Sequence, residues 1–242
     1  AVHSEADGDS LHVKLADQAV CIGPPPSDGS YLNVTAVMSA AEITGAQAIH
    51  PGYGFLAENP HFAEVTSECG LVFVGPPPEA MRLMGNKSEA RRTMAAAGVP
   101  IMPGSEAALA SLEEALALAD DIGYPVLVKA AAGGGGKGIR IVEDPADFMA
   151  KLTEARTEAE RSFGNGDVIV ERYITRPRHV EVQIIGDQTG TVLHLYERDC
   201  TIQRRYQKLI EESPSPSLDS RTRRDICSSA VRLAKAAGYY SA

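Results

Sequence analysis

The chain has 242 residues, of which 44% are hydrophobic, 5% aromatic and 23% charged. This composition supplies a buried core and excludes a disordered or fibrous chain, and no apolar run approaches the ~18 residues that a membrane-spanning helix needs. The 23 basic and 32 acidic residues give a formal net charge of -9, which argues against a general nucleic-acid binder because phosphate backbones attract basic surfaces. We therefore expect neither nucleic acid nor a membrane as a partner.

The placement of cysteines and charges indicates which kinds of binding site to expect. The four cysteines are widely spaced and form no Cys-x-x-Cys pair, so neither a zinc site nor a disulfide framework is indicated, and reduced thiols in a cytoplasmic location are expected. Residues 1–60 hold seven carboxylates against one lysine, whereas residues 198–208 hold four basic residues against one aspartate. An anionic ligand is therefore expected at the second stretch, where the local charge opposes that of the whole chain.

Short apolar runs alternate with helical patterns in the first part of the chain, which predicts βαβ units and a parallel sheet. Strands are expected at residues 19–22, 46–50 and 71–74, and helices at 33–44, 61–69 and 79–97. A Pro- and Gly-rich stretch at 100–105 then indicates a hinge or linker.

The rest of the chain predicts a small α/β module followed by an antiparallel hairpin. Ser111, with Glu114 three residues further on, forms a capping box that opens a helix to residue 122. After His179 the apolar residues alternate, and a turn and a second run follow, which is typical of a hairpin with one polar face. The expected strands are 124–129, 139–142, 168–171, 180–184 and 191–196, and the expected helices are 145–163 and 220–237.

The strongest local signal for a ligand is a run of four glycines at residues 133–136, followed by Lys137 and Gly138. Consecutive glycines let backbone N–H groups approach phosphate oxygens without obstruction by Cβ atoms, and Lys129 before the run adds a second positive charge. The spacing fits neither the Walker A pattern nor Gly-x-Gly-x-x-Gly. Because a strand follows, the segment is predicted to be a hairpin flap over a ligand, and the alternative is a flexible surface hairpin with solvated lysines.

Two further candidates precede the predicted hairpin. Glu171 ends a strand and precedes residues 172–174, a segment whose backbone could contact an adenine edge, although an isolated glutamate at a strand end is more often solvated. His179 precedes the first core residue of the hairpin, and a lone histidine is more often structural than functional.

Two charged or glycine-rich stretches allow two interpretations each. The mixed charges of 197–208 suit either a salt-bridged strand edge or a site for a small anion. The turn at 51–56 follows a predicted parallel strand, where open α/β sheets place ligands, but it could equally be a tight turn packed by Tyr53 and Phe55. No Gly-x-Ser-x-Gly elbow is present, so acyl transfer has no support.

With these residues assembled, the chain resembles biotin carboxylase, a family of ATP-grasp enzymes, over essentially its whole length. The resemblance implies an α/β fold with a Rossmann-like N-terminal lobe at 1–84 that lacks its first strand, ATP-grasp linker helices and lid at 85–173, and the truncated start of a C-terminal α+β lobe at 174–242. The motifs that carry it are His50-Pro-Gly-Tyr-Gly-Phe-Leu-Ala-Glu-Asn59, Met84-Gly-Asn-Lys87, Tyr124-Pro-Val-Leu-Val-Lys129 with the glycine flap, Pro177-Arg-His-Val-Glu181, Glu197-Arg-Asp-Cys200 and Gln203-Arg-Arg-Tyr-Gln-Lys208.

The resemblance also implies a reaction and its participants. In this family ATP phosphorylates bicarbonate to carboxyphosphate, whose CO2 passes to biotin tethered to a carrier, as the first half-reaction of an acyl-CoA carboxylase. Expected ligands are ATP, Mg2+ or Mn2+, bicarbonate and biotin, and expected partners are a biotin carboxyl carrier domain, a carboxyltransferase subunit and, at full length, further copies of the chain. Lys208 would hold bicarbonate, and the nucleotide would be bound by Lys87, Lys129, Gly135, Gly136, Glu171, Arg172, Tyr173, Ile174, His179, Gln203 and Tyr206.

The chain departs from the family pattern in two residues and in its extent. Tyr206 stands where a histidine is frequent, and Ala132 replaces a glycine; both are tolerable because a phenol still hydrogen-bonds and four glycines remain. Family members have an extra strand and helix before the first residue here and continue past Ala242 with the metal ligands. No metal ligand is therefore expected in this chain, and little or no bicarbonate-dependent ATPase by itself. A carbamoyl-phosphate-synthetase-like ligase and a non-catalytic nucleotide-binding or assembly module stay open as alternatives.

Overall fold

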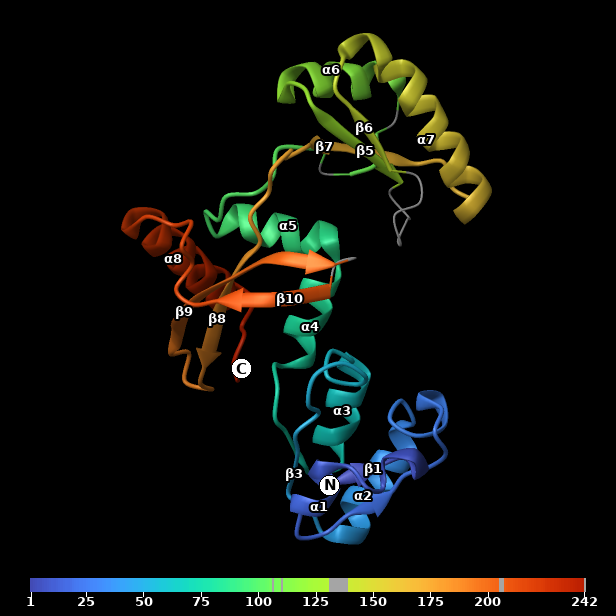
Figure 1. Cartoon of the computed structure of the whole chain (residues 1–242), viewed down its shortest axis with the longest axis vertical. Helices are drawn as coiled ribbons and strands as arrows, with labels where there is room; N and C mark the ends of the chain where they lie inside the picture. The colour runs from blue at the N-terminus through green and yellow to red at the C-terminus, as the bar shows by residue number, and fades with distance from the viewer. Residues whose placement is uncertain (106, 110, 131–138, 205–206, 242) are drawn as a thin grey trace. The chain divides into compact units, whose positions relative to one another are not determined.

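The computed structural model describes residues 1–105, 107–109, 111–130, 139–204 and 207–241 as a mixed α/β chain (Figure 1). The chain divides into two compact units. Unit 1 comprises Ala1–Asn86, Gln183–Leu195 and Ala230–Ala242, and unit 2 comprises Lys87–Val182 and Tyr196–Ser229. The alternation of helices and strands confirms the predicted α/β fold class.

The N-terminal part of unit 1 repeats a strand–helix–strand order. Its strands pair in parallel, β1 with β2 and β3 with β4, which confirms the predicted direction. Among the described residues they form two separate two-stranded sheets instead of one continuous sheet. The elements are β1 (Val2–His3), α1 (Leu11–Leu15), β2 (Val20–Cys21), α2 (Val34–Thr44), β3 (Ala48–Ile49), α3 (Pro60–Glu68), β4 (Val72–Phe73) and α4 (Pro78–Gly85).

Capping explains where the helices of unit 1 begin and end. The Asn33 side chain accepts a hydrogen bond from the Ala36 N–H at 3.1 Å, and the Asn59 side chain accepts one from the Phe62 N–H at 3.0 Å. Each bond satisfies a donor that the first helical turn leaves free. Gly45 ends α2 with φ of 63°, a left-handed conformation that costs glycine little. The predicted boundaries of α2 are therefore confirmed.

Unit 2 contains a three-stranded antiparallel sheet with strand order β6-β5-β7. Helices α6 and α7 lie over one face of this sheet (Figure 1). Alternate residues of β5 are buried, so Val126 and Val128 enter the core while Lys129 projects to the opposite face. The core also takes Ala115, Ala119, Val142, Phe148, Leu152, Ala155, Val168 and Val170. The elements are α6 (Leu112–Ile122), β5 (Val126–Ala130), β6 (Arg140–Val142), α7 (Phe148–Phe163) and β7 (Val168–Arg172).

Two predictions for this part of the chain are confirmed. The Ser111 hydroxyl accepts a hydrogen bond from the Glu114 N–H at 3.0 Å, which is the predicted cap of α6. The strands on either side of the glycine run, β5 and β6, are antiparallel neighbours, as a hairpin requires. The glycine run itself, residues 131–138, lies outside the described residues.

A second sheet has the order β10-β9-β8 and is followed by helix α8. Strand β9 extends well beyond the predicted end at residue 196, and its charged part pairs antiparallel with β10, which was not predicted. Hydrophobic periodicity did not predict this part of the strand, because its side chains are charged or polar on both faces and no apolar face distinguishes it. The elements are β8 (Val180–Gly186), β9 (Val192–Arg204), β10 (Gln207–Glu212) and α8 (Ser220–Ala236), and helix α5 (Lys87–Ala96) opens unit 2.

Candidate functional site

The basic stretch that sequence indicated as an anion site brings two cations to one carboxylate. Arg198 on β9 donates from Nε and Nη2 to Oε1 of Glu181 on β8, at 2.9 and 2.5 Å, and Lys208 Nζ on β10 donates to Glu181 Oε2. The hydrogen bond from Lys208 is the main cause that lowers the pKa of Glu181, and the same bond raises the pKa of Lys208. Both side chains therefore stay charged at neutral pH.

Nearby carboxylates neutralise the positive charge of this stretch. Besides Glu181, Glu211 on β10 lies 3.3 Å from Nε of Arg198, so two carboxylates face two cations. The local excess of positive charge expected from residues 198–208 is therefore smaller than the sequence indicated. The Lys208 side chain is 37% exposed, and an ammonium group has three N–H donors, so a small anion can still share it.

His179 and Gln203 lie next to Lys208 in the same sheet. The Gln203 amide nitrogen contacts Nδ1 of His179 and donates to the Cys200 carbonyl at 2.7 Å. The backbone of His179 is tied to β9 as well, because its carbonyl accepts the Cys200 N–H at 2.7 Å. Gln203 stands opposite Lys208 in the pairing of β9 with β10. The structure thus brings together three residues that the sequence presented far apart.

Lys129 and Glu171, predicted as separate contacts to phosphate and adenine, form an ion pair. Lys129 Nζ lies 2.6 Å from Oε2 of Glu171, and the two side chains are 29% and 19% exposed. The antiparallel register pairs Lys129 with Ile169 and Leu127 with Glu171, so the pair is diagonal across β5 and β7. Lys129 is consequently fixed on the sheet face opposite the core, with two N–H donors left for another partner.

The predicted adenine hinge, residues 171–174, is strongly tied to its own unit. The Arg172 guanidinium donates from Nη1 to the carbonyls of Ile122 and Gly123 at 2.7 and 2.8 Å, which closes the C-terminus of α6. The N–H groups of Arg172 and Tyr173 donate to the carbonyls of Pro103 and Pro125. The Arg172 side chain and these two amides are therefore occupied, and Ile174, which is 46% exposed, is the open part of the hinge.

A buried polar network on β9 was missed by sequence reasoning, which offered a salt-bridged strand edge or a site for a small anion. The Glu197 side chain is fully buried, and its Oε1 accepts Nε of Arg223 at 2.7 Å and the Ser215 N–H at 3.1 Å. Burial raises the pKa of Glu197, but the bonds from Arg223 and Ser215 outweigh it and leave a net lowering. Asp199 accepts the hydroxyls of Thr201 and Ser215, and the Thr201 bond is the main cause that lowers its pKa to about 2.

The structure gives no side-chain information for four of the residues predicted to bind the nucleotide. Gly135, Gly136 and Tyr206 lie outside the described residues, and of Lys87 the structure describes only its place as the first residue of α5. Their proposed contacts with the nucleotide stay predictions.

One group of potential metal ligands is found in the described part of the chain. Atoms of Glu181, Cys200 and Glu211 lie within 4.8 Å of one another. Both carboxylates are already neutralised by Arg198 and Lys208, and burial raises the pKa of the Cys200 thiol. Mg2+ prefers hard oxygen ligands and a site with uncompensated negative charge. This group therefore does not fit a magnesium ion.

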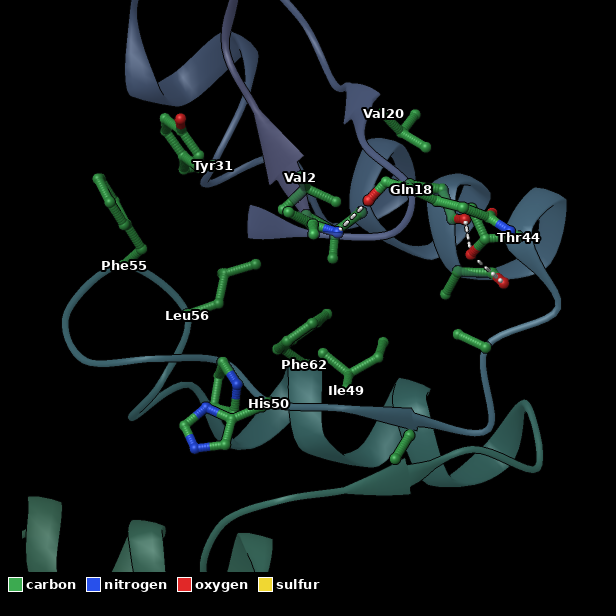
Figure 2. Close-up of a pocket in the computed structure, with 18 of the residues that line it drawn as sticks. Val2, Gln18, Val20, Tyr31, Thr44, Ile49, His50, Phe55, Leu56 and Phe62 are labelled. Atoms are coloured by element: carbon green, nitrogen blue, oxygen red, sulfur yellow. Dashed lines mark hydrogen bonds between the residues drawn. The ribbon is translucent and has the colours of Figure 1, made fainter. Parts of the chain in front are cut away.

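Among the described residues of unit 1, two cavities lie away from the predicted site residues. The first has a volume of about 570 Å³ and lies between β1, β3 and helix α2 (Figure 2). The second has about 540 Å³ and is lined by the turn at 51–54 together with Met81 and Met84. In that turn Tyr53 is 96% exposed, whereas Phe55 stacks on Tyr31 with ring centroids 4.9 Å apart. Of the two aromatic residues in this turn, Phe55 therefore packs against another ring, whereas Tyr53 is exposed.

Within the described residues no helix is both long and apolar enough to cross a membrane.

Comparison with protein families assigns both parts of the chain. Residues 1–81 match the family model for the biotin carboxylase N-terminal domain, and residues 86–242 match the model for the carbamoyl-phosphate synthase L chain ATP-binding domain. Biotin carboxylase 1 of Bacillus subtilis is 54% identical over 242 residues, which are 100% of this chain and 54% of that protein. The mitochondrial methylcrotonoyl-CoA carboxylase subunit alpha of Oryza sativa is 55% identical over all of this chain and 33% of its own length. The chain thus spans about half or less of these relatives.

Solved structures agree with this assignment. A biotin carboxylase complex with beta-gamma-ATP from Campylobacter jejuni has a TM-score of 0.83 and 53% identity, covering 99% of this chain and 54% of that one. A bicarbonate-bound biotin carboxylase domain of a thermophilic 2-oxoglutarate carboxylase has a TM-score of 0.93 and 45% identity, covering 100% of this chain and 52% of that one.

Proposed function

Because this chain belongs to the biotin carboxylase family, we propose that it supplies the nucleotide- and bicarbonate-binding surfaces for the ATP-dependent carboxylation of carrier-tethered biotin. ATP would phosphorylate bicarbonate to carboxyphosphate, and the CO2 released from it would pass to biotin, as the first half-reaction of a biotin-dependent acyl-CoA or related carboxylase. The observation that carries the proposal is the juxtaposition of Lys208, Gln203 and His179 on one sheet beside a carboxylate-bound arginine.

Lys208 is the proposed contact for bicarbonate. Its ammonium is held by Glu181, remains protonated because that bond raises its pKa, and is 37% exposed. A charged donor bonds a small anion more strongly than a neutral one. Glu181 fixes the position of the lysine without using all of its donors, so the anion would meet an oriented group and little reorganisation would be needed.

The nucleotide would be held by the other predicted residues. Lys129 would neutralise phosphate charge, and its bond to Glu171 holds it on the face of the sheet opposite the core. The Glu171–Ile174 segment would meet the adenine, chiefly at Ile174. Phosphoryl transfer depends mainly on such positioning and on charge neutralisation. Lys87, Gly135, Gly136, His179, Gln203 and Tyr206 are proposed to complete the contacts.

Two solved relatives support these ligands. The Campylobacter jejuni protein is named as a complex with beta-gamma-ATP, and the 2-oxoglutarate carboxylase domain is named as bound to bicarbonate. Another solved relative is named as a dimer of such a domain with MgADP, ADP and bicarbonate, which supports further copies of the chain as partners. Mg2+ would supply charge neutralisation on the phosphates, but the carboxylates of Glu181 and Glu211 do not fit it.

The carrier domain, the carboxyltransferase subunit and a cytoplasmic location are proposed from family membership. The carbamoyl-phosphate-synthetase-like alternative receives support from the model matched at 86–242, which bears that name. The model matched at 1–81 describes the N-terminal domain of biotin carboxylase, and it favours the first proposal.

Calorimetric titration of the 242-residue chain with ATP tests the nucleotide part of the proposal. Lys129→Met should weaken ATP binding by about tenfold or more, because a charge-assisted hydrogen bond to phosphate is lost. Lys151→Met is the matched control, since Lys151 donates to the Ile141 carbonyl from helix α7 and should leave ATP affinity unchanged. Unaltered affinity in Lys129→Met, or no ATP binding by the unsubstituted chain, would contradict the proposal.

A further inference from the structure

The Pro- and Gly-rich linker at 100–105 is held by a side chain of helix α5. Nη2 of Arg91 donates hydrogen bonds to the carbonyls of Met102 and Gly104, at 2.5 and 3.3 Å. These acceptors lie 11 and 13 residues further along the chain, and a guanidinium holds its donors in one rigid plane. Arg91 therefore fixes the path of the linker relative to α5.

The linker lies along strand β7, at the edge that β5 does not use. The carbonyl of Pro103 accepts the Arg172 N–H at 2.9 Å, and Gly104 forms an antiparallel bridge with Glu171. The Ser105 N–H also donates to a carbonyl of β7, at 2.8 Å. The linker is thus bonded to the start of the segment that is proposed to meet the adenine.

Gly104 brings the linker into direct contact with Glu171. A Cβ atom at this position would lie 2.8 Å from the Val170 carbonyl oxygen and 2.9 Å from Cγ of Glu171, closer than real Cβ atoms approach. Glycine permits this close approach because it has no side chain. The carboxylate of Glu171 in turn lies 2.6 Å from Nζ of Lys129. A shift of the linker would therefore move both the 171–174 segment and the partner of Lys129.

We propose that Arg91 is a positioning residue for the nucleotide, which holds the linker against Glu171 and thereby orients the 171–174 segment and Lys129. This role rests on the proposed function, because those residues are taken as contacts for ATP. Arg91 acts through the backbone of the linker. A displacement of about 1 Å in a positioning group can cost about 10²-fold in rate, so the loss of Arg91 should be measurable in ATP binding.

Calorimetric titration of the 242-residue chain with ATP tests this role. Arg91→Met should weaken ATP binding by about tenfold, and Arg91→Lys, which keeps one charged donor, should recover part of that loss. Arg92→Met is the matched control, since Arg92 is exposed on the same helix, and should leave the affinity unchanged. Partial unfolding alone would reduce the number of binding sites per chain and not the affinity of the folded molecules, and the titration measures both.

Amide exchange followed by NMR tests the link between Arg91 and β7 without ATP. In Arg91→Met the amides of Ser105 and Arg172 should lose protection by about tenfold or more, because the linker that pairs with β7 is no longer held. The Gly164 amide, which donates to the Glu160 carbonyl at the end of α7, should keep its protection. An equal loss at all three amides would indicate general destabilisation and overturn the proposal, as would no loss at any of them.

Gly104→Ala disturbs the same contact from the side of the linker. It should weaken ATP binding by about tenfold, whereas Gly8→Ala should not, because a Cβ there meets no listed neighbour closer than 3.8 Å. Should Arg91→Met fail to fold, Arg91→Lys and Gly104→Ala decide. Unchanged ATP affinity in Arg91→Met, or an equal loss in Arg92→Met, overturns this role and leaves the proposed function standing. Absence of ATP binding by the unsubstituted chain overturns both.

Discussion

Removal of the Glu197 carboxylate should destabilise unit 2 more than any surface substitution. Glu197 is fully buried on β9, and one oxygen accepts hydrogen bonds from the Arg223 guanidinium at 2.7 Å and from the Ser215 N–H at 3.1 Å. Its carbonyl also accepts the Ser213 hydroxyl at 3.0 Å. The side chain thereby fastens the segment after β10, and helix α8, to the middle of β9.

The expected loss follows from these contacts. A bond to a charged donor contributes about 1.5–3 kcal/mol and a neutral one about 0.5–1.5 kcal/mol, and both donors would be left without their partner in Glu197→Ala. Arg223 is 24% exposed and can regain some solvation, so we expect the free energy of unfolding to fall by about 3 kcal/mol. Glu197→Gln keeps an oxygen at the accepting position and should cost only about 1 kcal/mol, the charge-assisted part.

Urea unfolding followed by circular dichroism measures both values. Glu212→Ala is the control, because this glutamate is exposed at the end of β10 and exposed substitutions usually change stability by less than about 0.5 kcal/mol. The transition of unit 2 should move to lower urea with an unchanged slope. Equal losses in the Gln and Ala variants, or no loss in Ala, would show that the two hydrogen bonds to the carboxylate do not hold this region together.

Two further predictions concern pH and the C-terminus of α6. The pKa of Asp199 is lowered from 3.8 to about 2. The ionised carboxylate therefore stabilises the fold at pH values above the pKa of the unfolded chain, and this stabilisation is lost as pH falls toward 2. Acid unfolding of Asp199→Asn should depend less on pH between about 5 and 2 than that of the unsubstituted chain, and an identical pH dependence would refute this. Arg172→Met should destabilise unit 2 by about 2 kcal/mol, because the Gly123 and Ile122 carbonyls lose their donor, and thermal unfolding that matches the unsubstituted chain would count against it.

Local chemistry made much of the fold predictable. Asn33 and Gly45 mark the two ends of α2, and Ser111 marks the start of α6, because each satisfies backbone groups that a helix end exposes. The parallel strands of unit 1 followed from the alternation of short apolar runs with helices. Their division into two sheets did not, because strand neighbours far apart in sequence are set by tertiary packing.

The candidate site was predictable by residue type but not by pairing. Lys129 and Lys208 were singled out as cations, yet the carboxylates that bind them, Glu171 and Glu181, lie 42 and 27 residues away along the chain. Such distances are closed by strand register, which a single sequence does not reveal. Arg172 illustrates the same limit, since its side chain closes α6 and only its position in the motif suggested a ligand.

The run of charges at 197–199 shows why adjacent residues with similar chemistry have different tasks. Successive side chains of a strand point to opposite faces, so Glu197 and Asp199 face Arg223 and Ser215, whereas Arg198 between them faces Glu181. One face of β9 therefore anchors the segment that follows β10, and the other helps to orient the cation proposed to bind bicarbonate. Of these two networks, Lys208 contacts the second, through Glu181. A stability measurement alone cannot separate these effects, but anion binding by a variant that remains folded can, because only the Arg198 face contacts Glu181.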